Sequence, residues 1–102
     1  MSDYKLGSID QIPPGEGREF LVRNIKLAVF HLRDGSVYAT QAECPHRQGP
    51  LADGLTGNGI VVCPFHAWKF ALATGLPVFG ECSIQTYPAR LEGTELLVSI
   101  SE

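Results

Sequence analysis

The sequence predicts a single, mainly β domain: an antiparallel β-sandwich or small barrel that carries an inserted pair of loops. The chain has 102 residues, which is enough for one domain and too few for two. Short apolar, β-prone runs alternate with turn residues, and no helical apolar period persists over several turns. The centre of the chain departs from this pattern because it is rich in glycine and proline.

The first two strands are predicted at residues 4–9 and 19–22. Both runs contain apolar residues at β-like spacing. Residues 12–17, Ile-Pro-Pro-Gly-Glu-Gly, form a turn between them, because proline fixes φ and glycine permits positive φ.

A β-hairpin is predicted next, with strands at residues 27–32 and 37–40. The dipeptide Asp34-Gly35 lies between these two apolar runs. Such a dipeptide is typical of a type I′ turn, in which both central residues have positive φ.

A second hairpin is predicted at the end of the chain. Residues 87–91 and 96–100 are β-prone, and Glu92-Gly93 separates them. The strands and hairpins together favour an all-β architecture.

The middle of the chain has the composition of loops. Residues 44–59 show little alternation and contain four glycines and two prolines. A short apolar strand at 60–62 follows, residues 68–70 alternate, and Thr74-Gly75 forms another turn. We expect this section to be an insertion that holds two ligand-bearing loops.

Charge and composition exclude several classes of function. The net charge is -3 and no run of lysine or arginine is present, so we expect no nucleic-acid partner and no membrane partner. No stretch is apolar enough to cross a bilayer, and the first residues lack the order of a secretory signal, so we expect a soluble, cytoplasmic protein. Three cysteines make no even disulfide framework, and cysteines clustered with histidines indicate metal ligands or catalysis.

Two short motifs each supply one thiolate and one imidazole. The first is Cys44-Pro45-His46 and the second is Cys63-Pro64-Phe65-His66. A structural zinc ion accepts two cysteines and two histidines, but zinc fingers usually group cysteine with cysteine and histidine with histidine. Here the two types alternate, which favours a binuclear centre with one cysteine pair on one iron and one histidine pair on the other. Zinc remains the alternative at this point.

These motifs resemble those of the Rieske [2Fe–2S] family, with glycines and prolines filling both loops. The resemblance implies a Rieske-type antiparallel β fold and one [2Fe–2S] cluster. It implies that Cys44 and Cys63 bind the inner iron, and that His46 and His66 bind the outer iron, near the surface.

The resemblance extends over most of the chain. It implies a single Rieske domain over residues 1–102, with a cluster-binding subdomain at about residues 43–70. The sequence contains no nucleophile–base pair, phosphate loop or substrate motif. We therefore expect an electron carrier, or a non-catalytic component of an oxidoreductase system, and not an enzyme.

Four positions differ from the Rieske proteins of cytochrome bc complexes. Those relatives have a disulfide-linked cysteine in each loop, where this chain has Gly49 and Phe65. They also have serine and tyrosine hydroxyls where this chain has Trp68 and Phe70. Fewer hydrogen-bond donors stabilise the reduced cluster less, so we expect a potential on the order of −150 to −100 mV, at the low end of the Rieske range.

Two groups of soluble relatives compete. One is the ferredoxin of ring-hydroxylating dioxygenases, which implies a flavin-dependent, NAD(P)H-fed reductase as donor and a terminal oxygenase as acceptor. The other is the small subunit of assimilatory NAD(P)H-dependent nitrite reductase, which implies the nitrite reductase large subunit as partner. Residues 68–75 and 80–93 resemble the second group. The sequence does not identify the substrate of the partner.

Other conspicuous residues receive structural interpretations. We expect Cys82 to be a small buried hydrophobic residue, because most lone cysteines in β domains are buried. His31 is predicted to be a surface or edge residue. Phe65, Trp68 and Phe70 are predicted to pack around the cluster.

Overall fold

The computed structural model describes residues 2–45, 49–64 and 68–100. The predicted all-β class is confirmed, since the described residues form β-strands and two short 3₁₀ helices. The elements in chain order are β1 Ser2–Ser8, η1 Ile9–Gln11, β2 Glu16–Val22, β3 Ile25–His31, β4 Val37–Gln41, η2 Leu51–Asp53, β5 Leu55–Gly57, β6 Ile60–Val62, β7 Lys69–Ala71, β8 Pro77–Phe79, β9 Thr86–Tyr87, β10 Ala89–Glu92 and β11 Glu95–Ile100.

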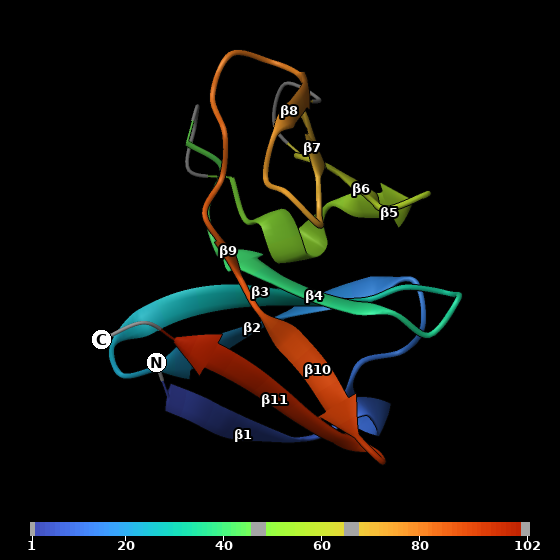
Figure 1. Cartoon of the computed structure of the whole chain (residues 1–102). Helices are drawn as coiled ribbons and strands as arrows, with labels where there is room; N and C mark the ends of the chain where they lie inside the picture. Colours follow the sequence, from blue (N-terminus) through green and yellow to red (C-terminus); the bar gives the residue numbers. More distant parts are fainter. Residues whose placement is uncertain (1, 46–48, 65–67, 101–102) are drawn as a thin grey trace.

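The described strands form three antiparallel sheets, with the orders β1-β11-β10, β2-β3-β4-β9 and β5-β6-β7-β8. The first two sheets make the base of the molecule, and the small third sheet stands at the opposite end (Figure 1). Helix η2 contacts β2 and β3 and lies between the base and the third sheet (Figure 1).

Strand β3 separates two hydrophobic cores. Its side chains alternate between the two faces of the sheet. Leu27 and Val29 pack into the core of the base, whereas Ala28 and Phe30 pack into the core beneath the third sheet. All four are fully buried, so β3 is covered on both faces. The two cores therefore share one strand, which joins the base to the end that carries the predicted loops.

The hairpin between β3 and β4 is confirmed, but its predicted turn type is wrong. Gly35 has φ 93°, whereas Asp34 does not have positive φ. The N–H groups of Leu32 and Gly35 donate to the carbonyls of Ser36 and Leu32, respectively. These bonds describe a three-residue loop with glycine in the left-handed position. Asp34 also accepts hydrogen bonds from the backbone and side chain of Ser36, which favours the longer loop.

Two type I′-like turns occur where the sequence interpretation named none. Arg23 and Asn24 both have positive φ between β2 and β3. Asn58 and Gly59 both have positive φ between β5 and β6. Asn-Gly is a strong hairpin signal, and it was assigned only to an irregular loop because β5 has three residues and shows no alternation.

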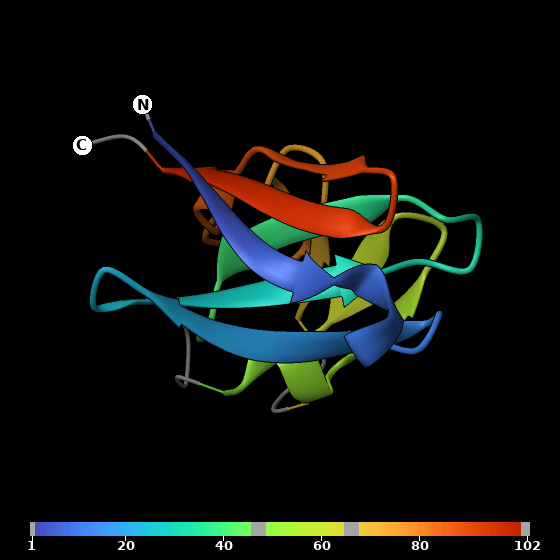
Figure 2. The same cartoon turned by 90° about the horizontal axis from the view of Figure 1, so that it is seen from below.

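The two ends of the described chain pair with each other at one edge of the base, where Ser2 lies opposite Ile100 (Figure 2). Asp3 on β1 accepts hydrogen bonds from Arg90 on β10 (2.8 Å) and from Ser99 on β11. Hydrogen bonding to Arg90, and next to Ser99, lowers the pKa of the Asp3 carboxyl from 3.8. These contacts link all three strands of the first sheet.

Candidate metal centre

The two predicted ligand loops are built in the same way. The Cys44 N–H donates to the Gly49 carbonyl at 2.8 Å, and the Cys63 N–H donates to the Trp68 carbonyl at 2.7 Å. Each cysteine is therefore the first residue of a segment that returns to it five residues later. Strand-like pairing continues outside each closure, between residues 43 and 50 and between residues 62 and 69. Both cysteines thus occupy equivalent positions at the base of a hairpin-like loop.

The structure brings two of the four predicted ligands into one core. Cys44 and Cys63 are each 1% exposed and belong to the hydrophobic cluster beneath the third sheet. His46 and His66 lie outside the described residues. Residues 2–45, 49–64 and 68–100 contain no group of three or more His, Cys, Asp or Glu side chains placed to hold a metal ion.

Gly54 allows the two loops to approach each other. It follows η2, and a Cβ atom at this position would lie 2.2 Å from the carbonyl oxygen of Val62. Real Cβ contacts are essentially never below 3.0 Å. The Leu51 N–H also donates to the Ala42 carbonyl at 2.9 Å, across the base of the first loop. The backbone after the first loop can therefore lie directly on the strand that leads into Cys63.

Two aromatic side chains follow the second loop, at the positions where the Rieske proteins of cytochrome bc complexes carry hydroxyl groups. Phe70 is fully buried in the same core as both cysteines, and Trp68 is half-buried and packs against that core. Their ring centroids are 6.5 Å apart and the rings are tilted by 55°. Phe65 lies outside the described residues. For Trp68 and Phe70, the arrangement agrees with packing next to the ligand-bearing loop.

The cysteine environment fits an iron–sulfur cluster. Thiolates are the ligands that such clusters require. A thiolate in an apolar core has a high desolvation cost unless a cation offsets its charge, and bound iron supplies that compensation. Cys44 and Cys63 would be the cluster ligands on the described residues, and the bound cluster supplies one-electron redox chemistry.

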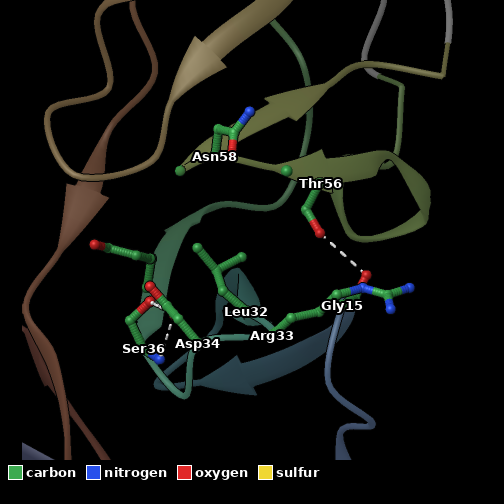
Figure 3. Close-up of a pocket in the computed structure, with 10 residues that line it drawn as sticks. Gly15, Leu32, Arg33, Asp34, Ser36, Thr56 and Asn58 are labelled. Carbon is green, nitrogen blue, oxygen red and sulfur yellow. Dashed lines mark hydrogen bonds between the residues drawn. The ribbon is translucent and has the colours of Figure 1, made fainter.

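A cavity of about 580 Å³ lies elsewhere, between the Leu32–Ser36 loop and the Asn58-Gly59 turn (Figure 3). Its rim includes a hydrogen bond from the Thr56 hydroxyl to the Gly15 carbonyl (3.0 Å). Asn58 and Gly59 precede β6, whereas Cys63 follows it, so the cavity and the second loop are at opposite ends of this strand. The cavity is therefore separate from the metal centre.

Two interpretations of single residues are corrected. Cys82 is exposed, because it lies in the loop between β8 and β9 where Ile84, two residues later, enters the core instead. His31 is not at an edge, because β3 is flanked by β2 and β4. It is half-buried, and its Nδ1 is 2.7 Å from the Ile12 carbonyl oxygen.

Comparison with known proteins identifies the kind of centre. The model of the Rieske [2Fe-2S] domain family matches residues 2–88. The biphenyl dioxygenase ferredoxin subunit of Pseudomonas sp. (strain KKS102) is 36% identical over 104 residues, which cover 99% of this chain and 94% of the relative.

Solved structures agree in fold over nearly the whole chain. A protein assigned as an NADH-dependent nitrite reductase small subunit, from Mycobacterium tuberculosis, superposes with a TM-score of 0.90 at 26% identity and covers 99% of this chain and 96% of its own. A chain in the complex of reduced oxygenase and oxidized ferredoxin in carbazole 1,9a-dioxygenase has a TM-score of 0.82 at 27% identity, with coverages of 94% and 100%.

These matches settle the choice between zinc and iron that the two motifs left open. The chain carries a Rieske-type [2Fe–2S] cluster and acts as an electron carrier, not as a catalytic enzyme. With its two buried cysteines at the bases of two matching loops, the chain belongs to the Rieske [2Fe–2S] domain family.

Proposed function

We propose that this chain transfers single electrons from an NAD(P)H-fed, flavin-dependent reductase to the terminal oxygenase of a ring-hydroxylating dioxygenase. The nicotinamide gives two electrons to the flavin, which releases them singly. The oxidised cluster accepts one electron from the flavin and then passes it to the oxygenase. The support is the 36% identity to a dioxygenase ferredoxin over 99% of this chain.

We further propose that Cys44, His46, Cys63 and His66 are the four cluster ligands. The support is the equivalence of the two loops, since each begins with a buried cysteine and is closed by the same backbone hydrogen bond. The histidines follow their cysteines by two and three residues in the sequence. In this proposal residues 1–102 act as one Rieske domain in the cytoplasm, with about residues 43–70 binding the cluster. The described residues form no helix suited to span a membrane.

The surface next to the second loop suits contact with the oxygenase. Val78 and Phe79 on β8 are 55% and 60% exposed, and with Trp68 they line a shallow hollow. Trp68 closes the second ligand loop, so this apolar surface adjoins the base of a loop that would supply one ligand to each iron. An electron acceptor must approach the cluster closely, and exposed apolar side chains commonly mark protein contacts.

The small subunit of an assimilatory nitrite reductase is the second candidate. It is favoured by the sequence at residues 68–75 and 80–93 and by the structural likeness to a nitrite reductase small subunit. In that case the chain would work inside a complex with the large subunit instead of as a separate carrier.

Reconstitution distinguishes the two candidates. The purified holoprotein is mixed with NADH, a dioxygenase flavoprotein reductase, an oxygenase and an aromatic substrate, and product formation is followed. Product that depends on this chain supports the carrier. Co-purification from the source cells with a sirohaem-bearing large subunit, and no product in the assay, would overturn it in favour of the nitrite reductase subunit.

Two variants test the apolar contact in the same assay. We expect Phe79→Ser to slow reduction of the oxygenase without changing the reduction potential of the cluster. Leu21→Ser is the matched control, because Leu21 is 68% exposed on β2, in the base of the molecule. Equal rates of oxygenase reduction by the two variants would exclude β8 from the contact with the oxygenase.

The ligand assignment is tested by metal analysis. We expect His46→Ala and Cys63→Ala to lose the bound iron and inorganic sulfide, because cluster binding requires all four ligands. Cys82→Ala is the control and should retain both, since Cys82 is exposed and lies outside the two loops. Full iron and sulfide in His46→Ala would remove that residue from the ligand set.

A further inference from the structure

Gly80 lies against the indole ring of Trp68 with no space for a side chain. A Cβ atom at Gly80 would be 2.7 Å from both Cδ2 and Cε3 of Trp68, and 3.1 Å from its Cγ. Gly80 has φ 130° and belongs to the loop between β8 and β9. The backbone of this loop is therefore in direct contact with the face of the ring.

Trp68 connects this contact to the metal centre. Its carbonyl accepts the hydrogen bond from the Cys63 N–H that closes the second ligand loop, and its ring packs against the core containing Cys63. Because the ring packs against this close-packed core, a displaced ring would disturb the packing beside the closure of the loop. Trp68 therefore connects Gly80 to the backbone of Cys63, a predicted cluster ligand.

We propose that Gly80 is a positioning residue for the cluster: because it lacks a side chain, it holds Trp68 against the second loop and keeps water from that side of the centre. This inference rests on the proposed ligand set. The added electron makes the reduced cluster more negative, and water stabilises that charge. The close contact between Gly80 and Trp68 therefore helps to keep the reduction potential low.

Gly80→Ala tests this inference in the holoprotein. We expect the midpoint potential to move to a more positive value. Trp68 is the single tryptophan of the chain, so intrinsic fluorescence reports on this ring alone. Its emission should shift to the red, and the ring should become more accessible to the quencher acrylamide.

Gly35→Ala is the matched control. Gly35 also has positive φ (93°), but a Cβ atom there would meet nothing within 4 Å. Both variants therefore carry backbone strain at an alanine, and only Gly80→Ala disturbs Trp68. An unchanged potential and unchanged emission in Gly80→Ala, as in Gly35→Ala, would overturn the inference.

A double variant covers the case in which Gly80→Ala retains no cluster. Trp68→Leu removes the ring that the new methyl group would strike. If the contact is the cause, Gly80→Ala/Trp68→Leu retains as much iron as Trp68→Leu alone, and the two have the same potential. Loss of iron only when Gly80→Ala is added to Trp68→Leu would overturn the inference.

Iron and sulfide analysis of the wild-type protein distinguishes failure of the proposed function from failure of this inference. Absence of iron and sulfide in wild type would refute the proposed function. The fluorescence arm would still test the contact between Gly80 and Trp68, because it does not require the cluster.

Discussion

Cys44 and Cys63 place two sulfur atoms among aliphatic and aromatic side chains, and each residue is only 1% exposed. Their thiolate forms would be costly in this environment without a cation. Binding of the cluster offsets that cost, so we expect cluster binding and the stability of both loops to be coupled. The residues around the sulfurs then determine how readily the cluster accepts an electron.

Phe70→Tyr should raise the reduction potential. Phe70 is fully buried in the core that contains both cysteines, and it occupies a position where high-potential relatives have a hydroxyl. One added neutral hydrogen bond contributes about 0.5–1.5 kcal/mol, and about 1.4 kcal/mol corresponds to 59 mV for one electron. We therefore expect a rise of roughly 20–60 mV, measured by protein-film voltammetry.

Phe20→Tyr provides the control for this change. Phe20 is half-buried and packs against the other core, in the base of the molecule. The reduction potential of Phe20→Tyr should equal that of the wild type. A lower potential in Phe70→Tyr, or equal shifts in both variants, would contradict the role assigned to missing hydroxyl groups.

Some individual residues could be predicted from the sequence and others could not. The order of cysteine and histidine in the two motifs predicts Cys44 and Cys63 as ligands, and the structure places both cysteines in one core. Gly80 was missed because a close approach between backbone and ring leaves no pattern in the residues around it. Cys82 was assigned to the core from the general behaviour of lone cysteines, whereas its loop turns inward at Ile84.

The ligand loops depend on the elements that flank them. The second loop joins β6 and β7, and the first is followed by η2, which lies against β2 and β3. Gly54 brings the end of η2 onto the carbonyl of Val62, next to Cys63. The spacing of the two loops is therefore set by a backbone contact outside both of them.

Gly54→Ala should weaken cluster binding and destabilise the fold. Gly54 has φ -76°, which alanine can adopt, so the effect comes from the added Cβ atom, which would clash with the carbonyl oxygen of Val62. Overpacking of this kind costs about 1–3 kcal/mol. Denaturant unfolding and the iron content of the purified variant measure the two effects.

Gly57→Ala is the control on the neighbouring strand. Gly57 ends β5, and a Cβ atom there would meet nothing within 4 Å. We expect this variant to keep its iron and nearly all of its stability. Equal behaviour of the two variants would mean that Gly54 does not set the distance between the loops.

Asp3→Asn should lower the melting temperature slightly at pH 7, because it removes the ion pair that links β1 to β10. The pKa of Asp3 is below 3.8 in the folded protein, so the charged form favours folding. This contribution is present above pH 3.8 and is lost as the pH falls through the lower pKa of the folded state. Thermal unfolding of both proteins between pH 3 and pH 7 tests this.

The expected difference has a defined sign. It should be constant near neutral pH, shrink only at acid pH and decrease with added salt, because the pair is exposed. A difference that grows as the pH falls would contradict the assigned direction of the pKa shift.

Longer strands were predicted better than short ones. The strands at 27–32 and 37–40 were placed within a few residues, because β3 and β4 have clear apolar runs. Strand β8 was missed, since three residues cannot display an alternating pattern and β8 begins with Pro77. The predicted strand at 87–91 joined the end of β9 to β10, because two residues of β9 show no pattern of their own. Strand β8 pairs with the nearby β7, whereas β9 pairs with β4, which is distant in the sequence.

The core that joins the two ends of the described chain and the core that contains the predicted ligands lie at opposite ends of the molecule. The base contains one core and both ends of the described chain, and the opposite end contains the second core with both cysteines (Figure 1). Strand β3 contributes to both cores, so the loops stand on a rigid sheet. A rigid support limits the structural change on reduction, which suits an electron carrier.

An EPR-monitored redox titration of the purified holoprotein tests whether this chain is a low-potential Rieske electron carrier. We expect reduction to produce a Rieske-type signal, from a protein with two irons and two inorganic sulfides, at a midpoint of about −150 to −100 mV. Zinc without sulfide would contradict the presence of the cluster. A Rieske signal with a midpoint above about +100 mV would contradict the low-potential electron carrier.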